Sequence, residues 1–354
     1  RFFADKLREL GVEPEWHIVA EGRPNVYGCV KLGPSDKLIT LTGHTDTVDI
    51  AENWLTDPFD PVIKDGKLYG LGSYDMKSGL VCALAAFKAL IETPELHDQL
   101  GNVAFAATVD EEALGLGAQA LLETKYGKSD AMLLGEPMWG DAAGPIPLGL
   151  TGKVLYKLTV VGRAAHGFYP DRGVNAVEDA AKIVASLDQL NLYDHPEHGR
   201  GNYSTLKFEG GYQEYAIVVP ERCEVIITRL TVPGENRASA VADMQALIDS
   251  LDLDCEVTIE TPAPFYEPYL IDENSSFVDD FKAAYEGVIG RPPVCGFGRG
   301  ITDGNIYVAD GGIPTITFGP RGNGPHECNE YVEIDSLEPV AQVFADTVVN
   351  FFKK

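Results

Sequence analysis

Histidine and acidic residues of this sequence stand where apolar runs end, and their types suit metal-dependent hydrolysis. The residues concerned are His44 and Asp46, Asp110-Glu111-Glu112, Glu136 and His326. Two histidines and several carboxylates from separate strand ends suit a pair of divalent ions that share a bridging carboxylate. Ligation by nitrogen and oxygen without thiolate fits zinc, and cobalt or manganese could take its place. We therefore predict a site for two divalent ions per chain, with zinc preferred.

Two of the shorter motifs are weak when each is taken alone. In His44-Thr45-Asp46 the carboxylate stands two residues from the imidazole, where it could accept the second ring N–H of a metal-bound histidine. A structural histidine gives the same spacing. Asp75 follows a glycine-rich loop at the start of a helical stretch, where aspartate is also a common N-cap. Each motif leaves a structural alternative open.

Three consecutive carboxylates at Asp110-Glu111-Glu112 carry a stronger signal. Neighbouring negative charges repel one another unless cations or solvent intervene. Gly115 and Gly117 follow closely, and glycine lets a backbone approach a ligand. A metal site and a solvated turn are both consistent with this segment.

The elements that must position these residues are short, continuous apolar runs, typical of strands buried on both faces of an α/β sheet. The runs are residues 38–42, 103–109, 131–134 and 313–318. Between the first two, apolar residues recur with the 3.6-residue period of a helix from Leu80 to Ile91. Ligands of open α/β sheets bind beyond the carboxyl ends of the strands, which is where the polar residues cluster. We expect a mixed, mostly parallel sheet flanked by helices.

The middle of the chain has a different pattern, which predicts a second domain. Its expected elements, in order, are a strand at 153–161, a helix at 174–190, strands at 203–208 and 223–232, a helix at 238–251 and a strand from 255. The order β-α-β-β-α-β is a known self-contained unit of the ferredoxin-like type. We therefore predict an inserted α+β domain at 151–261 within a catalytic domain formed by 1–150 and 262–354.

The bulk composition excludes some classes of function. The formal net charge of −26 over 354 residues disfavours binding to nucleic acid and to anionic membranes. No apolar run approaches the ~20 residues that a membrane span needs. Six cysteines without a paired spacing suit free thiols, and we expect a cytoplasmic protein. The sequence begins with Arg1 rather than methionine, so a cleaved signal peptide stays an open alternative.

Together these motifs resemble a family of zinc-dependent aminoacylases, acetylornithine deacetylases, succinyl-diaminopimelate desuccinylases and glutamate carboxypeptidases. The matching segments, in the family's order, are Gly43–Val48, Gly72–Lys77, Asp110–Gly115, Gly135–Pro137, Ala165–Gly167, Gly173–Ala176 and His326–Glu330. The resemblance covers nearly the whole chain. It implies an amidohydrolase that cuts an amide bond of an N-acyl amino acid or short peptide.

The resemblance also implies roles for single residues. His44 and Glu136 hold one metal ion, Glu112 and His326 hold the other, and Asp75 bridges the two. The general base is Glu111, which takes a proton from the attacking water, and Asp46 buttresses His44. His166 is similar to a family histidine that reaches the active site of a neighbouring subunit and steadies the oxyanion. The inserted domain would then be both a lid and the contact of a homodimer.

Departures from the family pattern bear on the substrate. Ile217 stands where the family often has asparagine, and Asn305 follows Thr302-Asp303-Gly304 where desuccinylases carry arginine. Both departures argue against succinyl-diaminopimelate. Arg229 matches a family arginine that grips a substrate carboxylate, and arginine can do so with two parallel hydrogen bonds. A surface arginine on a strand is the alternative.

Three functions remain open after this comparison. The first is a deacetylase-like N-acyl amino acid hydrolase, and the second is a dipeptidase or carboxypeptidase of the same family. The third is a non-catalytic metal-binding homologue, against which Glu111 and the complete set of ligand types argue.

Overall fold

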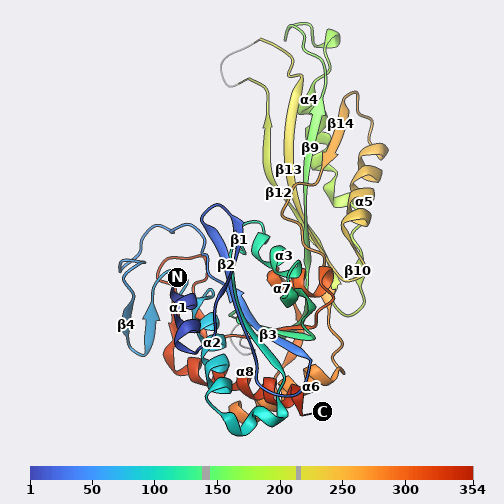
Figure 1. The fold of residues 1–354 in the computed structure, drawn as a ribbon. Coiled ribbons are helices and arrows are strands. Elements are labelled where there is room, and N and C mark those ends of the chain that lie inside the picture. The colour runs from blue at the N-terminus through green and yellow to red at the C-terminus, as the bar shows by residue number, and fades with distance from the viewer. Residues whose placement is uncertain (138–143, 213–216, 354) are drawn as a thin grey trace. The chain divides into compact units, whose positions relative to one another are not determined.

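Two separate stretches of the chain, Arg1–Leu150 and Leu270–Lys354, form unit 1 of the computed structural model, and Thr151–Tyr269 forms unit 2 (Figure 1). The structure describes residues 1–137, 144–212 and 217–353. Unit 2 extends beyond the expected boundary at 261/262, because Tyr266 and Lys153 exchange two backbone hydrogen bonds of 2.8 and 2.9 Å.

Unit 1 is built around a six-stranded mixed sheet with the order β1-β2-β6-β3-β7-β17. Its strands are β1 (Glu15–Ala20), β2 (Arg23–Lys31), β3 (Leu38–His44), β6 (Asn102–Thr108), β7 (Ala131–Leu134) and β17 (Thr315–Thr317). The four strands β6, β3, β7 and β17 run parallel to one another. Strand β2 pairs antiparallel with both of its neighbours, β6 and β1. The expected fold class is confirmed.

Helices of unit 1 cover this sheet and one another. They include α1 (Phe2–Glu9), α2 (Lys77–Ile91), α3 (Leu116–Leu122), α6 (Ser276–Ile289) and α8 (Leu337–Phe352). Helix α2 packs against β3, β6 and α8, and the residues it buries include Leu80, Phe87 and Leu90 of the predicted apolar face. Helix α8 also packs against α6.

Two smaller sheets of unit 1 were not expected from the sequence. One has the order β15-β8-β16, with β8 (Ile146–Leu150), β15 (Tyr269–Leu270) and β16 (Cys295–Gly298). The other has the order β18-β19-β5-β4, with β4 (Val62–Lys64), β5 (Lys67–Tyr69), β18 (Gly322–Asn323) and β19 (Tyr331–Glu333). The second sheet joins the segment before Asp75 to the segment around His326, so it bears on the site.

Unit 2 has the predicted β-α-β-β-α-β order. Its elements are β9 (Gly152–Val161), α4 (Ala176–Ala185), β12 (Asn202–Gly210), β13 (Arg222–Thr231), α5 (Arg237–Ser250) and β14 (Glu256–Glu260), with a short β10–β11 hairpin (Asp194–His195, Gly199–Arg200). The strands form an antiparallel sheet with the order β12-β13-β9-β14. Alternate residues of β9 and β13 pack with α4 and α5 into a core of their own.

Two further features concern the helices and the thiols of the described chain. No helix among the described residues is long and apolar enough to span a membrane. The six cysteines are free.

Candidate metal centre

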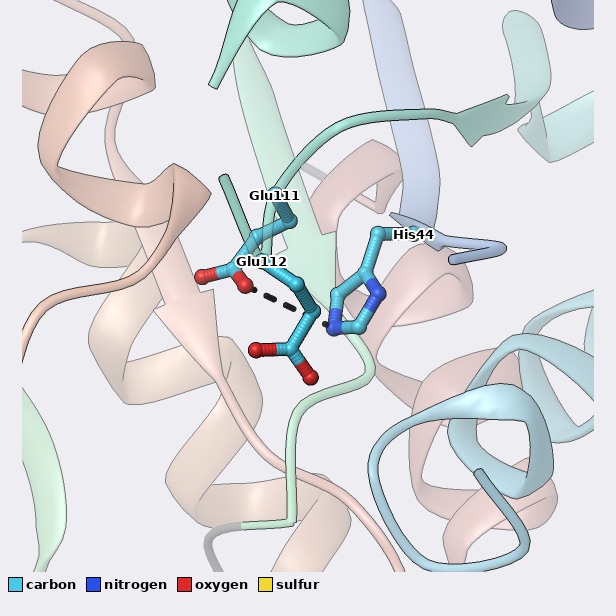
Figure 2. Close-up of side chains that lie close together, drawn as sticks. All are labelled: His44, Glu111 and Glu112. Carbon is cyan, nitrogen blue, oxygen red and sulfur yellow. Dashed lines mark ion pairs between the residues drawn. The ribbon is translucent and has the colours of Figure 1, made fainter. Parts of the chain in front are cut away.

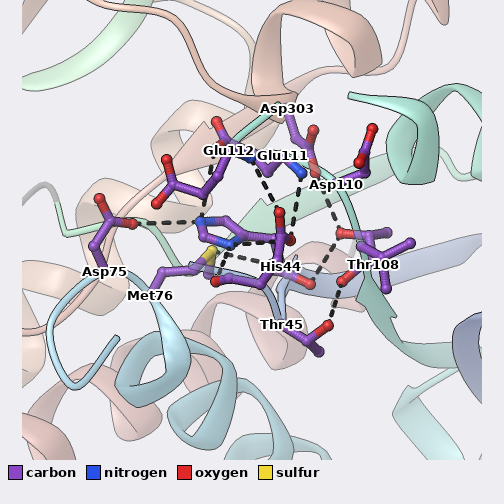
Figure 3. A network of polar contacts seen from close by, with 12 residues as sticks. His44, Thr45, Asp75, Met76, Thr108, Asp110, Glu111, Glu112 and Asp303 are labelled. Atoms are coloured by element: carbon purple, nitrogen blue, oxygen red, sulfur yellow. Dashed lines mark hydrogen bonds and ion pairs between the residues drawn. The ribbon is translucent and has the colours of Figure 1, made fainter. Parts of the chain in front are cut away.

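The carboxyl ends of the parallel strands gather the candidate residues at one edge of the unit 1 sheet (Figure 3). His44 is the last residue of β3, and Glu111 and Glu112 follow β6. Glu136 lies just beyond β7, and Asp75 precedes α2. Parallel neighbours end on the same side of a sheet, so residues far apart in sequence meet here.

Asp75 stands between the two histidines of the site. Its Oδ1 lies 3.3 Å from His44 Nε2, and its Oδ2 lies 3.5 Å from His326 Nε2. The two carboxylate oxygens therefore face different imidazoles, as a bridging ligand requires. The alternative N-cap role is not realised, because Met76 is the N-cap residue of α2 and makes no side-chain cap bond to any described residue.

Three overlapping groups of ligand atoms surround this bridge, each with all its atoms within 4.8 Å of one another. They are His44–Asp75–Glu136, Asp75–Glu112–His326 and His44–Glu111–Glu112. Figure 2 shows the third group. His326 Nε2 lies 3.0 Å from a Glu112 oxygen, and His44 Nε2 lies 3.8 Å from a Glu111 oxygen. The side chains of Glu111 and Glu112 are sheltered, with 13% and 8% of them exposed. The solvated-turn alternative for this segment therefore does not apply.

Two buried atoms of the site test whether a cation fits. His44 Nε2 and Glu136 Oε1 have no hydrogen-bond partner in the described part of the chain, although both are buried. They lie 3.5 Å apart. Buried polar atoms without partners are costly, and a divalent ion between a nitrogen and an oxygen donor would satisfy both. The residues present therefore fit a metal ion.

Charge and burial shift the acid–base properties of these groups in the metal-free site. Burial acts to lower the pKa of His44, but the charge of Glu136 and the carboxylate of Asp46 hold that pKa well above its ordinary value. A hydrogen bond between His326 and Asp75 raises the pKa of His326 to about 9. In the metal-free site the neighbouring carboxylates therefore favour the protonated form of both imidazoles.

The acidic groups shift in the direction that burial dictates. Burial raises the pKa of Glu136 well above its ordinary value, and it raises the pKa of Glu111 to about 8. Asp75 and Asp46 are exceptions. Burial acts to raise the pKa of each, but the histidine partners hold the pKa of Asp75 well below its ordinary value, and His44 together with backbone N–H groups lowers that of Asp46. Burial therefore favours the protonated form of Glu111 and Glu136, whereas bound divalent cations would favour the ionised form.

Contacts of the second ring nitrogen of His44, Nδ1, fix the orientation of the imidazole. Its Nδ1 lies 3.1 Å from the backbone oxygen of Asp46 and 3.6 Å from the Asp46 carboxylate. The nearer acceptor is the backbone carbonyl, which fixes Nδ1–H and leaves Nε2 for a ligand. The Asp46 carboxylate instead accepts the backbone N–H groups of Glu111 and Glu112, at 3.4 and 3.2 Å.

Two buried acids support the site without having been predicted. Glu330 accepts the backbone N–H groups of Gly72, Tyr74 and Asp75 at 2.7–2.8 Å, and so holds the loop that carries the bridging carboxylate. Asp303, at the start of the short helix α7 (Asp303–Asn305), is fully buried. Burial raises the pKa of Asp303 to about 7, and its carboxylate accepts a hydrogen bond from Thr108 at 3.2 Å.

The two remaining candidates lie in unit 2. His166 is exposed, forms an isolated bridge with Val218, and its ring Nδ1 accepts the backbone N–H of Phe168 at 3.2 Å. Arg229 is fully buried, and its guanidinium pairs with Glu235 and, at 2.8 Å, with Asp243 of α5. The Arg229 side chain thus has structural partners in unit 2, and its contact with substrate stays a prediction.

Comparisons with known proteins agree with this geometry. The sequence profile of peptidase family M20/M25/M40 matches residues 40–350. A succinyl-diaminopimelate desuccinylase of Methylorubrum extorquens is 29% identical over 370 residues, covering 99% of this chain and 93% of the relative.

Solved structures share the fold. The M20 family metallo-carboxypeptidase Sso-CP2 of Sulfolobus solfataricus has a TM-score of 0.79 at 18% identity, covering 99% of this chain and 93% of that one. Bacillus subtilis YXEP, described as a dinuclear metal-binding peptidase from the M20 family, has a TM-score of 0.71 at 17% identity, covering 99% and 90%.

Proposed function

The chain belongs to peptidase family M20/M25/M40 and is a hydrolase of amide or peptide bonds, and from this premise we propose that it cleaves an N-acyl amino acid or a short peptide with two divalent ions. The observation that carries the proposal is the position of Asp75, whose two oxygens face His44 and His326 at 3.3 and 3.5 Å. The description of YXEP as a dinuclear metal-binding peptidase supports it.

In the proposed arrangement each ion has its own imidazole. His44 and Glu136 hold one ion, Glu112 and His326 hold the other, and Asp75 is shared. Zinc is preferred because the donors are nitrogen and oxygen, and cobalt or manganese can substitute. When bound, such a pair supplies a water whose pKa is lowered to about 7 and polarises the carbonyl oxygen of the scissile bond.

Glu111 is the proposed general base. Its carboxylate lies 3.8 Å from His44 Nε2, next to both proposed ion positions, and is partly sheltered from solvent. Glu111 takes a proton from the attacking water and passes it to the amine that leaves. The positive charge of two ions favours the ionised carboxylate and so counteracts the effect of burial.

We infer that the substrate is an N-acyl amino acid of the deacetylase type. The desuccinylase of Methylorubrum extorquens acts, by its name, on an acylated amino acid, which supports this class. Asn305 stands where desuccinylases of the family resemblance carry arginine, so a succinyl group is not the preferred acyl group. The family resemblance assigns a free carboxylate of the substrate to Arg229, whose guanidinium also pairs with Glu235 and Asp243.

His166 and a homodimer complete the proposal. The family resemblance assigns this histidine to the oxyanion of a neighbouring subunit, and its exposure in unit 2 is compatible with that role. A histidine donor aimed at a developing oxyanion contributes ~2.7–4 kcal/mol in comparable sites.

Metal reconstitution and a substrate screen test the proposed function. Chelated protein is titrated with Zn²⁺, Co²⁺ or Mn²⁺ and then assayed against N-acetyl and N-succinyl amino acids and dipeptides. We expect two ions per chain and metal-dependent release of free amine from an N-acyl amino acid. Binding of one ion at most would contradict the two-metal site. Cleavage of dipeptides alone would favour the peptidase alternative, and binding without cleavage would favour the non-catalytic homologue.

A further inference from the structure

Arg23, the first residue of β2, joins the segment that follows His44 to the loop that carries Glu111 and Glu112. Its Nη1 lies 2.6 Å from Asp110 Oδ1, and its Nη2 lies 3.7 Å from Asp46 Oδ2. Asp46 follows β3, and Asp110 follows β6. The two carboxylates are sheltered, with 14% and 5% of their side chains exposed, whereas 44% of the arginine side chain is exposed.

Each of these carboxylates organises a part of the site without lying in any of its ligand groups. The Asp46 carboxylate accepts the N–H groups of Glu111 and Glu112, and the Asp46 carbonyl oxygen lies 3.1 Å from His44 Nδ1. Asp46 therefore sets the position of Glu111, the proposed base, relative to the imidazole of His44.

Asp110 shapes the turn that follows β6. Its backbone has a φ of 72°, a left-handed conformation that is uncommon for residues other than glycine. Its carboxylate accepts the N–H groups of Leu114 and Leu116, at 3.3 and 3.4 Å. The turn that presents Glu111 and Glu112 thus depends on where the Asp110 side chain is held.

A guanidinium is well suited to hold two such carboxylates together. It is planar, always charged, and presents several N–H donors in a fixed fork, whereas a lysine ammonium is a point charge on a flexible stem. Without a cation, Asp46 and Asp110 would repel each other and the acidic groups beside them. The loops after β3 and β6 would then separate.

We propose that Arg23 is a positioning residue of the metal centre, which fixes the Glu111–Glu112 turn against His44 through Asp46 and Asp110. The inference rests on the proposed function, because it assigns Arg23 a part in holding the two ions. Arg23 lies outside the short motifs that carry the family resemblance, and its proposed role follows from these contacts alone.

A cavity beside Arg23 allows the proposal to be tested by chemical rescue of an Arg23 variant. The cavity, of about 380 Å³, is lined by residues that include Phe3, Trp16, Arg23, Thr45, Asp46 and Val109. Removing the arginine side chain enlarges it next to the two carboxylates. A free guanidinium ion can then enter and restore the lost positive charge and the lost N–H donors.

The test compares wild type with Arg23→Ala and Arg23→Lys, and with Arg8→Ala as the control. Arg8 pairs with Asp5 at 2.9 Å on the exposed surface of α1, away from the site. Melting temperature reports the fold, and cobalt titration followed by the visible absorption of bound Co²⁺ reports affinity and geometry. Each variant is also titrated with and without a non-denaturing concentration of guanidinium.

We expect Arg23→Ala to weaken the binding of at least one cobalt ion by about 10–100-fold and to change its absorption. Arg23→Lys should be weakened less, and guanidinium should restore Arg23→Ala but leave Arg8→Ala unchanged. Wild-type cobalt affinity and absorption in Arg23→Ala would overturn the proposal. If that variant does not fold, Arg23→Lys decides, and wild-type values there would overturn it.

The outcome separates this inference from the proposed function. Wild-type protein that binds two cobalt ions but cleaves no amide contradicts the function, while the cobalt data still decide the role of Arg23. Wild-type protein that binds no cobalt overturns both.

Discussion

Asp75 shows how much of the chemistry depends on the placement of one side chain. Its two oxygens are divided between His44 and His326, which come from opposite ends of the chain. Glu330 holds the backbone at Asp75 through three N–H groups of the same loop. The separation of the two proposed ions is therefore set by a loop that is itself hydrogen-bonded to the segment of His326.

Glu111→Gln separates binding from chemistry. Glutamine keeps the shape of the side chain but cannot accept the proton of the attacking water, so kcat should fall by about 10²–10⁴-fold. Zinc content by elemental analysis should stay at the wild-type value, since Glu111 is not a proposed ligand. The exposed Glu123→Gln serves as the control and should keep wild-type turnover. Near-normal kcat in Glu111→Gln with full zinc content would show that another group is the base.

Metal binding should release protons. The pKa of His326 is raised to about 9 and that of Glu111 to about 8 in the metal-free site, so protons occupy the site at pH 7. Zinc must displace the proton of His326, and its affinity should therefore rise with pH up to about 9 and then level off. Calorimetric titrations in two buffers of different ionisation enthalpy measure the protons released. Binding at pH 7 with no proton release would contradict this prediction.

Close contacts between elements, rather than single ligands, fix the frame of the site. Gly79 in the first turns of α2 lies against the backbone that follows β7, and a Cβ atom there would stand 1.6 Å from the carbonyl oxygen of Gly135. Glu136 is the next residue. The helix can approach the strand end only because neither residue has a side chain.

Gly79→Ala should therefore damage both stability and metal binding. The clash forces α2 away from β7, which should cost about 1–3 kcal/mol or more of unfolding free energy and displace Glu136. Gly287→Ala is the matched control, because a Cβ there meets no described atom within 4 Å and Gly287 lies in α6. The control should gain roughly 0.5–1 kcal/mol. Urea denaturation and zinc content measure both effects, and equal stability of the two variants would refute the close contact.

Sequence patterns predicted the main elements well because their signals are local. The apolar run at 131–134 coincides with β7, and the run at 38–42 lies within β3. The small sheet β18-β19-β5-β4 was missed because its strands have two or three residues each, too few for any periodicity. Alternation along β13 could not reveal that Arg229 is buried and pairs with Asp243 of α5.

The supporting residues of the site escaped prediction for a different reason. Glu330 bonds to a backbone N–H 258 residues away in sequence, and Arg23 meets Asp110 across two strands of the sheet. Such pairs have no spacing that a single sequence can reveal. The proposed ligands could be named from the sequence because several histidines and acids follow separate apolar runs, and because these motifs together resemble a known family.

At the scale of the whole molecule, unit 2 interrupts unit 1, and Leu150 and Leu270 belong to strands of the same small sheet. An inserted unit with its own core can present His166 to a second chain, which a mixing experiment can detect. His166→Ala and Glu111→Gln should each have low kcat when alone.

Mixing these two variants should restore part of the activity, because a mixed dimer contains one site with an intact Glu111 and the partner's intact His166. Loss of kcat with little loss of zinc in His166→Ala would mark a transition-state contact. Native mass measurement must show a dimer and exchange of subunits. A mixture that exchanges subunits but stays as inactive as its parents would place the histidine outside the partner's site.

The split of unit 1 also sets an order of events during translation. Four of the five proposed ligands precede unit 2 in the chain, and only His326 follows it. Roughly 200 residues separate Glu136 from His326, so at ~5–20 residues per second a ribosome needs roughly 10–40 s to pass from one to the other. During that time the nascent chain holds the acidic ligands and His44 without the second imidazole. Unit 2 is synthesised in full within this interval, so the proposed second ion can be held only after the whole of unit 2 has been made.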